Sequence, residues 1–240
     1  MQACSSLHDQ EGRVTVPGFY DAVRPPEQWE RDELSKLPIT EDDYAKFLGV
    51  TEFFPPPGYS SLEGIRFCPT LEFNGVGGGY QGEGSKTVIP AEAFAKITCR
   101  LVPDQKAEDI ARKVKQAIIE ACPSAVRVEV ELKGGGDPYV VIPPGKPGSS
   151  GQESDLMKKA FSVAEDCIES NFGTRPIFLR EGGSIPIIQD LKELAGLDSL
   201  MIGLFTNEDN LHAPDESFHL GIMERAINSF EEFFNQLVRD

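Results

Sequence analysis

The spacing of the apolar residues changes twice between positions 70 and 132, and this change constrains the fold more than any other feature. Apolar and polar residues alternate over 70–73 and again over 91–101, as they do in strands with one buried face. Apolar residues then recur at helical spacing from Asp104, a predicted helix cap, and alternation returns over 126–132. Amphipathic strands around an amphipathic helix predict an α+β domain, an antiparallel sheet with helices on one face.

Two short helices are predicted before this sheet. One starts near Pro26 and carries Trp29, the single tryptophan of the chain. The other begins at its cap Thr40 and stops at Gly49. A threonine hydroxyl can accept hydrogen bonds from the first turn of a helix, and glycine adopts the left-handed backbone that ends one.

The chain changes character after a stretch rich in proline, glycine and serine at 143–151. The elements predicted beyond it are a helix from Ser154 to Gly173, a strand at 177–179, a helix from Pro186 to Gly196, a strand at 200–202 and a last helix over 222–237. Such alternation is typical of parallel strands covered by helices, so we expect an α/β region. The predicted domains are therefore 1–137 and 138–240.

Two loops of the second domain are candidates for a binding site. In open α/β sheets, ligands bind beyond the carboxyl ends of the strands. Loop 182–184 follows the first predicted strand, and loop 206–216 follows the second. We expect these two loops to converge on one crevice.

Composition excludes several classes of partner. The formal net charge of −16 is spread along the chain and repels nucleic-acid phosphates and anionic membrane surfaces. The sequence has no apolar run of about 18 residues and no signal peptide at its start, so we expect no membrane span and no secretion. Its five cysteines are odd in number and never spaced Cys-x-x-Cys, which favours reduced thiols in a cytoplasmic protein.

Two glycine-rich motifs imitate nucleotide sites without their structural context. Residues 77–82 fit the dinucleotide pattern G-x-G-x-x-G, and residues 79–87 approach a Walker A loop. Neither precedes a predicted helix, and Ser85 separates the glycine from the lysine in the second motif. A close-packed turn is the better interpretation, and it leaves Thr87 or Lys86 able to face a ligand.

Two further side chains admit both a functional and a structural interpretation. Arg100 lies mid-strand in the predicted sheet, where it is either solvated or available to clamp a carboxylate with its planar guanidinium. His212 lies in an acid-rich loop, where it either ligates a divalent metal or is held by neighbouring carboxylates. Spacing alone leaves both alternatives open. The sequence has no Gly-x-Ser-x-Gly elbow and no His-Glu-x-x-His motif.

Six segments, in this order along the chain, carry a family resemblance. They are VPGFYD (16–21), TLEFNG (70–75), GEGSKTVIP (82–90), CRLVP (99–103), REGGSIP (180–186) and HAPDE (212–216). Together they resemble the cocatalytic zinc peptidases that include glutamate carboxypeptidase and aminoacylase. Within that family they are most similar to the branch of cytosolic non-specific dipeptidases and carnosinases.

The resemblance implies a phosphorylase/hydrolase-like catalytic domain interrupted by a lid that forms a homodimer. It implies two divalent metals, zinc or manganese, and a dipeptide or small peptide as the substrate. His212 matches a metal-ligating histidine. Thr87 and Arg100 match lid residues that bind the C-terminal carboxylate of the substrate, in many members within the partner's site. Ser184 matches a residue at the same end of the substrate, and Glu181 matches one near its free amino group.

The resemblance also has gaps. Several motifs that family members carry before the matched region have no match here. They are a His-x-Asp motif, a metal-bridging aspartate, a Glu-Glu pair with the general base, a further acidic ligand and a lid His-Ser-Gly motif. One histidine cannot hold zinc tightly, because zinc takes three or four protein ligands. We therefore expect the C-terminal portion of a metal-dependent dipeptidase: a lid lacking its first strand and the end of the catalytic domain. Alone it would be inactive, with no tightly bound metal.

Two other functions remain open. A non-catalytic association module would use the lid to pair with itself or with a full-length homologue. A weaker alternative is an amino-acid-binding pocket without chemistry. In every case a missing strand and half-sheet would leave apolar faces uncovered, so we expect aggregation or obligate assembly.

Overall fold

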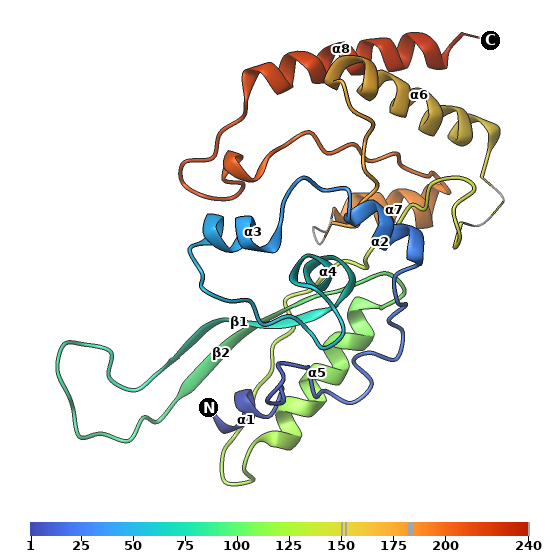
Figure 1. Ribbon diagram of the computed structural model, residues 1–240. Helices are drawn as coiled ribbons and strands as arrows, with labels where there is room; N and C mark the ends of the chain where they lie inside the picture. Colours follow the sequence, from blue (N-terminus) through green and yellow to red (C-terminus); the bar gives the residue numbers. More distant parts are fainter. Residues whose placement is uncertain (150, 152, 182–184, 240) are drawn as a thin grey trace. The chain divides into compact units, whose positions relative to one another are not determined.

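The computed structural model describes residues 1–149, 151, 153–181 and 185–239 (Figure 1). It contains two compact units, each made of separate stretches of the chain. Unit 1 comprises Met1–Pro26, Pro38–Val140 and Arg180–Gln189, and unit 2 comprises Glu27–Leu37, Val141–Leu179 and Asp190–Asp240. The division into domains 1–137 and 138–240 stays a prediction.

Unit 1 is built on two antiparallel strands, β1 (Thr70–Gly78) and β2 (Ala93–Arg100) (Figure 1). Their register shifts between Phe73 and Gly75, so the ladder contains one irregularity. Leu71 is buried while its neighbours along β1 are more exposed, as the alternating sequence predicts. The two predicted strands of this region are therefore confirmed.

Helix α5 (Ala107–Ala121) packs its apolar side against this sheet. Ile110 and Val114 lie one turn apart and are buried in the same cluster as Leu71 of β1. The N-terminal segment completes this core with four buried side chains, Leu7, Val14, Val16 and Phe19. The expected antiparallel sheet with a helix on one face is confirmed for unit 1.

The start of α5 differs from the prediction. Asp104 has a φ of +77° and does not cap the helix, whose N-cap residue Lys106 makes no side-chain cap hydrogen bond. The carboxylate of Asp137, 30 residues further on, takes this role because its Oδ1 accepts from the Ala107 N–H at 2.8 Å. Its Oδ2 accepts from the Lys106 ammonium at 2.7 Å. Asp104 instead forms an ion pair with Arg24 at 3.3 Å.

Three short helices also belong to unit 1: α1 (Gln2–Ser5), α3 (Glu41–Leu48) and α4 (Ser61–Phe67). The predicted ends of α3 are confirmed. Thr40 caps its start in a reciprocal capping box with Asp43, and Gly49 ends it with a φ of +70°. Both signals lie within one turn of the helix that they delimit.

Residues 79–92 join β1 to β2 without a helix. Gly77 and Gly78 are the last residues of β1, and a side chain at Gly77 would come within 2.4 Å of the Phe94 ring. This close packing fits the interpretation of the glycine motifs as a turn rather than as a nucleotide-binding loop.

Unit 2 contains the two longest helices, α6 (Asp155–Phe172) and α8 (Leu220–Leu237), which pack side by side (Figure 1). Small buried side chains lie on both helices, among them Ala164 of α6 and Ala226 of α8. The predicted limits of α6 are confirmed, since Ser154 caps it and Gly173 ends it. None of the described helices combines the length and the apolar composition that crossing a bilayer requires.

Helix α2 (Gln28–Leu34) is confirmed and belongs to unit 2. The Trp29 indole N–H donates to the Pro147 carbonyl at 3.1 Å. The buried carboxylate of Glu33 accepts from the Phe178 N–H at 3.3 Å. Two later segments of unit 2 are thereby tied to this early helix.

Three predicted strands are wrong, because the described residues form no hydrogen-bonded strand at 126–132, 177–179 or 200–202. Helix α7 (Pro186–Ala195), which begins at the predicted proline, and the 3-10 turn η1 (Asn207–Asp209) are formed. A strand requires a neighbour that pairs with its backbone. No such neighbour is present among the described residues, so the helices of the expected α/β region are seen without its parallel sheet.

Candidate functional site

Glu181 has the most defined surroundings of the predicted site residues. Arg66 of α4 donates from Nη2 to Glu181 Oε1 at 3.2 Å and from Nη1 to the Leu62 carbonyl at 3.1 Å. The arginine side chain is 13% exposed and the glutamate 56%, so the cation is largely covered while the carboxylate faces solvent. A capping box between Ser60 and Glu63 fixes the start of α4. Glu181 is thus oriented by an arginine and remains accessible to a ligand cation.

Sequence reasoning missed Arg66. It lies 115 residues from Glu181, and no spacing rule connects positions so far apart. Its only local signal is its place in the last turn of a helix with a capping box.

Ser184 lies outside the described residues, as does the whole of loop 182–184. The other predicted loop, 206–216, belongs to unit 2, whereas Glu181 belongs to unit 1. The expected convergence of the two loops on one crevice therefore stays a prediction.

Arg100 and Thr87 lie at opposite ends of the β1–β2 ribbon. Arg100 is exposed and is the last residue of β2 rather than a mid-strand residue, because the ladder ends at its partner Thr70. Thr87 is exposed in the connection 79–92, which leaves the sheet beyond Ala93. The eight residues of β2 span about 23 Å between these ends. The ribbon therefore does not bring the two side chains together within one protomer.

His212 lies exposed in a tight turn of unit 2. Asn210 and His212 have φ values of +54° and +65°, which Asn and His tolerate better than most side chains. The turn is built on Asp209, whose buried carboxylate accepts from the Thr206 N–H at 2.7 Å. The Asp209 carbonyl accepts from the Ser217 N–H at 2.9 Å. One of the acidic neighbours of His212 therefore serves the turn itself.

The residues that the structure describes do not fit a bound metal by themselves. They contain no group of three or more histidine, cysteine, aspartate or glutamate side chains that could hold an ion. Zinc sites use three or four protein ligands. His212 and the exposed carboxylates of Glu208, Asp215 and Glu216 supply at most a part of such a set.

Cys99, next to Arg100, is a poor nucleophile at neutral pH. Burial and, less strongly, the Glu72 carboxylate raise the pKa of its thiol to about 11. The thiolate is the reactive form of cysteine, so a pKa this high suppresses reactivity. The raised pKa therefore does not favour covalent catalysis by Cys99.

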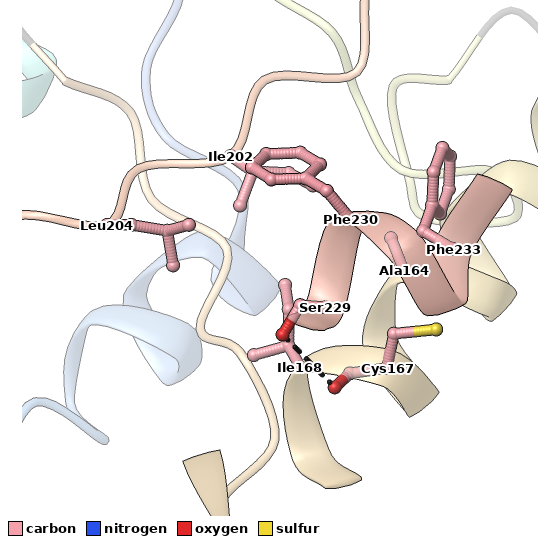
Figure 2. A pocket seen from close by; sticks show the side chains of 8 residues that line it. All are labelled: Ala164, Cys167, Ile168, Ile202, Leu204, Ser229, Phe230 and Phe233. Atoms are coloured by element: carbon pink, nitrogen blue, oxygen red, sulfur yellow. Dashed lines mark hydrogen bonds between the residues drawn. The ribbon is translucent and has the colours of Figure 1, made fainter. Parts of the chain in front are cut away.

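The cavity between α6 and α8 is too small for a peptide. Its volume is about 10 Å³, roughly the room that one water needs. Figure 2 shows its lining, which consists of Ala164, Cys167, Ile168, Ile202, Leu204, Ser229, Phe230 and Phe233. The Ser229 hydroxyl already donates to the Arg225 carbonyl at 2.8 Å. This cavity is a packing gap and no substrate pocket.

Comparison with known families identifies the first half of the chain. Residues 1–126 match the family described as peptidase dimerisation domain. The chain belongs to this family. The dimerisation domain accounts for β1, β2 and α5, which form the sheet and helix of unit 1.

Curated relatives of this dimerisation-domain chain are dipeptidases by name. Cys-Gly metallodipeptidase DUG1 of Candida albicans is 26% identical over 219 residues, which are 90% of this chain and 42% of the relative. Human Beta-Ala-His dipeptidase is 24% identical over 237 residues, 98% of this chain and 44% of the relative. The chain thus spans less than half the length of these two relatives. The predicted resemblance to the dipeptidase and carnosinase branch is confirmed.

Solved structures show the same fold. The M20 family metallo-carboxypeptidase Sso-CP2 from Sulfolobus solfataricus has a TM-score of 0.79 and 28% identity, covering 98% of this chain and 51% of that protein. The dipeptidase Dug1p from Saccharomyces cerevisiae has a TM-score of 0.78 and 23% identity, covering 99% and 47%. The similarity therefore extends well beyond the dimerisation domain, over nearly all of this chain.

Proposed function

We propose that this chain is the C-terminal portion of a metal-dependent dipeptidase. In this proposal residues 1–137 form the lid and dimerisation domain, and residues 138–240 form the end of a phosphorylase/hydrolase-like catalytic domain. The observation that carries it is coverage: named dipeptidases match 90–98% of this chain within 42–47% of their own length. The relatives are named for Cys-Gly and β-Ala-His, so a dipeptide or small peptide is the proposed substrate class.

The exposed side chains of this chain have binding roles in the proposal. The Arg100 guanidinium suits the terminal carboxylate of a peptide, since its planar fork can donate two parallel hydrogen bonds. The Thr87 hydroxyl would donate to the same carboxylate. The Glu181 carboxylate suits the free ammonium group at the other end of the substrate. Ser184 is assigned to the carboxylate end by family resemblance alone.

A homodimer through the lid supports these roles. Thr87 and Arg100 lie at opposite ends of the ribbon of one protomer. In a homodimer, one ligand would contact the Thr87 hydroxyl of one protomer and the Arg100 guanidinium of the other. The ribbon and its connection also expose four large apolar side chains, by 51–97%: Val76, Val88, Ile89 and Phe94. Exposed apolar surface of this kind marks interfaces.

The parent family uses divalent metals, zinc or manganese, which activate water and polarise the peptide carbonyl. His212 would provide one neutral nitrogen ligand. Because the described residues supply no set of three ligands, we assign the other ligands and the general base to polypeptide outside residues 1–240. The chain alone is then inactive. All five cysteines are free, which supports a reducing compartment, and we propose the cytoplasm.

Metal analysis and hydrolysis assays test this proposal. Purified residues 1–240, supplied with zinc or manganese, should hold fewer than two metal ions per chain and hydrolyse neither Cys-Gly nor β-Ala-His. A chimera that joins the preceding portion of a DUG1 relative to this chain should hydrolyse the dipeptide, and His212→Ala should abolish that activity. His219→Asn is the matched control, because asparagine keeps an N-cap acceptor at the start of α8.

A stoichiometric two-metal site with dipeptide hydrolysis in the isolated chain would refute the proposed division of labour. A chimera whose activity survives His212→Ala would remove the assigned role of that histidine.

A non-catalytic association module is the second candidate, and the exposed apolar ribbon favours it. Such a module would pair with itself or with a full-length homologue. Sedimentation that shows a strict monomer, together with no full-length partner in pull-downs, would remove this candidate.

A further inference from the structure

The last two residues of helix α4 hold two consecutive residues that precede loop 182–184. Arg66 donates from Nη2 to Glu181 Oε1 at 3.2 Å. The Arg180 guanidinium lies over the Phe67 ring, with its Cζ 5.4 Å from the ring centroid, which is within the range of a cation–π contact. Phe67 is buried and the Arg66 side chain is 13% exposed, so the surroundings of α4 in unit 1 fix both holding groups. We call these two contacts the α4 clamp.

The ion pair of the α4 clamp acts on position more than on stability. Glu181 is 56% exposed, and an ion pair with an exposed partner adds little to the free energy of folding. The Nε of Arg66 is buried and has no hydrogen-bond partner among the described residues. A buried polar group without a partner is costly, so stability alone does not explain this placement of Arg66. The pair holds the Glu181 carboxylate in one place and leaves it accessible.

The α4 clamp also ties Glu181 to Arg100. Helix α4 leads directly into β1, whose first residue Thr70 is the ladder partner of Arg100 (Figure 1). Thr70 follows Arg66 by four positions, which limits the distance between their Cα atoms to about 14 Å. Paired Cα atoms in an antiparallel ladder are only about 5 Å apart. Glu181 and Arg100 of one protomer therefore belong to the same end of the ribbon, whereas Thr87 lies beyond the other end.

We propose that Arg66 is a positioning residue that limits the length of the peptide substrate. The inference rests on the proposed function, in which Glu181 binds the free ammonium group and Arg100 binds the terminal carboxylate. The α4 clamp then fixes the separation of these two binding groups. Each further residue lengthens an extended peptide by about 3.3–3.6 Å. A tripeptide therefore cannot satisfy both ends of a site whose separation suits a dipeptide, and the dipeptide is preferred.

Limited proteolysis of the chain tests the clamp itself. Trypsin cleaves after arginine, and a segment that is held in place is cleaved more slowly than a loose one. Arg66→Met should speed cleavage after Arg180 at least about fivefold, while cleavage at the other sites stays unchanged, which separates local release from unfolding. Arg66→Lys keeps a cation for Glu181 and should restore slow cleavage. Arg112→Met is the matched control, because it removes an exposed arginine that pairs with Asp109 on α5.

The chimera with a DUG1 relative tests the length preference, with Cys-Gly and the tripeptide Cys-Gly-Gly as substrates. Arg66→Met should lower the ratio of kcat/KM for the dipeptide to kcat/KM for the tripeptide about tenfold. Most of this loss should be a higher KM for Cys-Gly, because a displaced carboxylate binds the ammonium group less well. Arg66→Lys should keep the ratio within about threefold of the parent value, and Arg112→Met within about twofold.

Two results would overturn the inference. The first is cleavage after Arg180 that is equally fast in the parent chain and in Arg66→Met, which would remove the clamp. The second is an active chimera that shows no preference for the dipeptide, or whose preference survives Arg66→Met. A chimera that hydrolyses neither peptide would remove the proposed function and the length limit with it, while cleavage after Arg180 would still decide whether the clamp exists.

Discussion

Removal of the Asp137 carboxylate should loosen the start of α5. The N-cap residue of this helix makes no side-chain cap hydrogen bond, so the Ala107 N–H depends on Asp137 Oδ1 at 2.8 Å. A helix cap contributes about 0.5–2 kcal/mol. The ion pair with Lys106, whose side chain is 60% exposed, adds at most about 1 kcal/mol. We therefore expect Asp137→Ala to lower the free energy of unfolding of unit 1 by about 1–2 kcal/mol.

The contribution of Asp137 should depend on pH. Burial acts to raise the pKa of its carboxyl, but hydrogen bonds from Lys106 and from the Ala107 N–H outweigh it, so the pKa lies below its ordinary value. A carboxyl with a lowered pKa stabilises the fold above its unfolded pKa, near 3.9, and this stabilisation is lost as pH falls through the folded pKa. The stability difference between the parent chain and Asp137→Asn should be present at pH 7 and shrink below about pH 4.

Hydrogen exchange along α5 measures this effect directly. Asp137→Ala should speed exchange of the amides of Ala107–Ala121 about five- to thirtyfold at pH 7, which corresponds to 1–2 kcal/mol. Asp104→Asn is the matched control, because it removes one negative charge near the same helix end and asparagine tolerates a φ of +77°. Exchange that changes equally in both variants, or that does not change in Asp137→Ala, would refute the capping role.

Two further predictions concern the core of unit 1. With a pKa of about 11, Cys99 of the folded chain should react with iodoacetamide at pH 8 at least about tenfold more slowly than Cys4. In denaturant the two cysteines should react at the same rate. Peptide mapping by mass spectrometry checks this, and equal rates in the folded chain would contradict it. Ile110→Ala should cost about 2–5 kcal/mol in urea unfolding, since Ile110 is 3% exposed. Ile119→Ala, at a position of the same helix that is 43% exposed, should cost less than about 1 kcal/mol, and comparable losses would contradict the packing.

Features that depend on neighbouring residues could be predicted from the sequence. Helices α3 and α6 begin directly after the predicted caps Thr40 and Ser154 and end at the predicted glycines, Gly49 and Gly173. A cap contacts backbone groups within one turn, so all the information lies in a few consecutive residues. The same holds for β1 and β2, which are neighbours in the sequence as well as in the sheet.

Two errors and one omission involve partners that are distant in sequence or not among the described residues. Asp104 carries the local signature of a cap, yet the carboxylate of Asp137, 30 residues beyond Ala107, accepts from the first turn of the helix instead. Arg66 orients Glu181 from 115 residues away, where no pattern could reveal it. Residues 200–202 have the apolar character of an inner strand, but a strand is defined by the neighbour to which it bonds.

The candidate site is incomplete in the same physical sense as the sheet of unit 2. Thr87, Arg100 and His212 are exposed, and no hydrogen bond or ion pair within the described residues holds their side chains. Recognition of a small ligand requires such groups to be oriented and partly removed from water, because electrostatic interactions are weak at full exposure. In the proposed function, a second surface covers them. In that proposal the second surface belongs to the polypeptide that carries the remaining metal ligands.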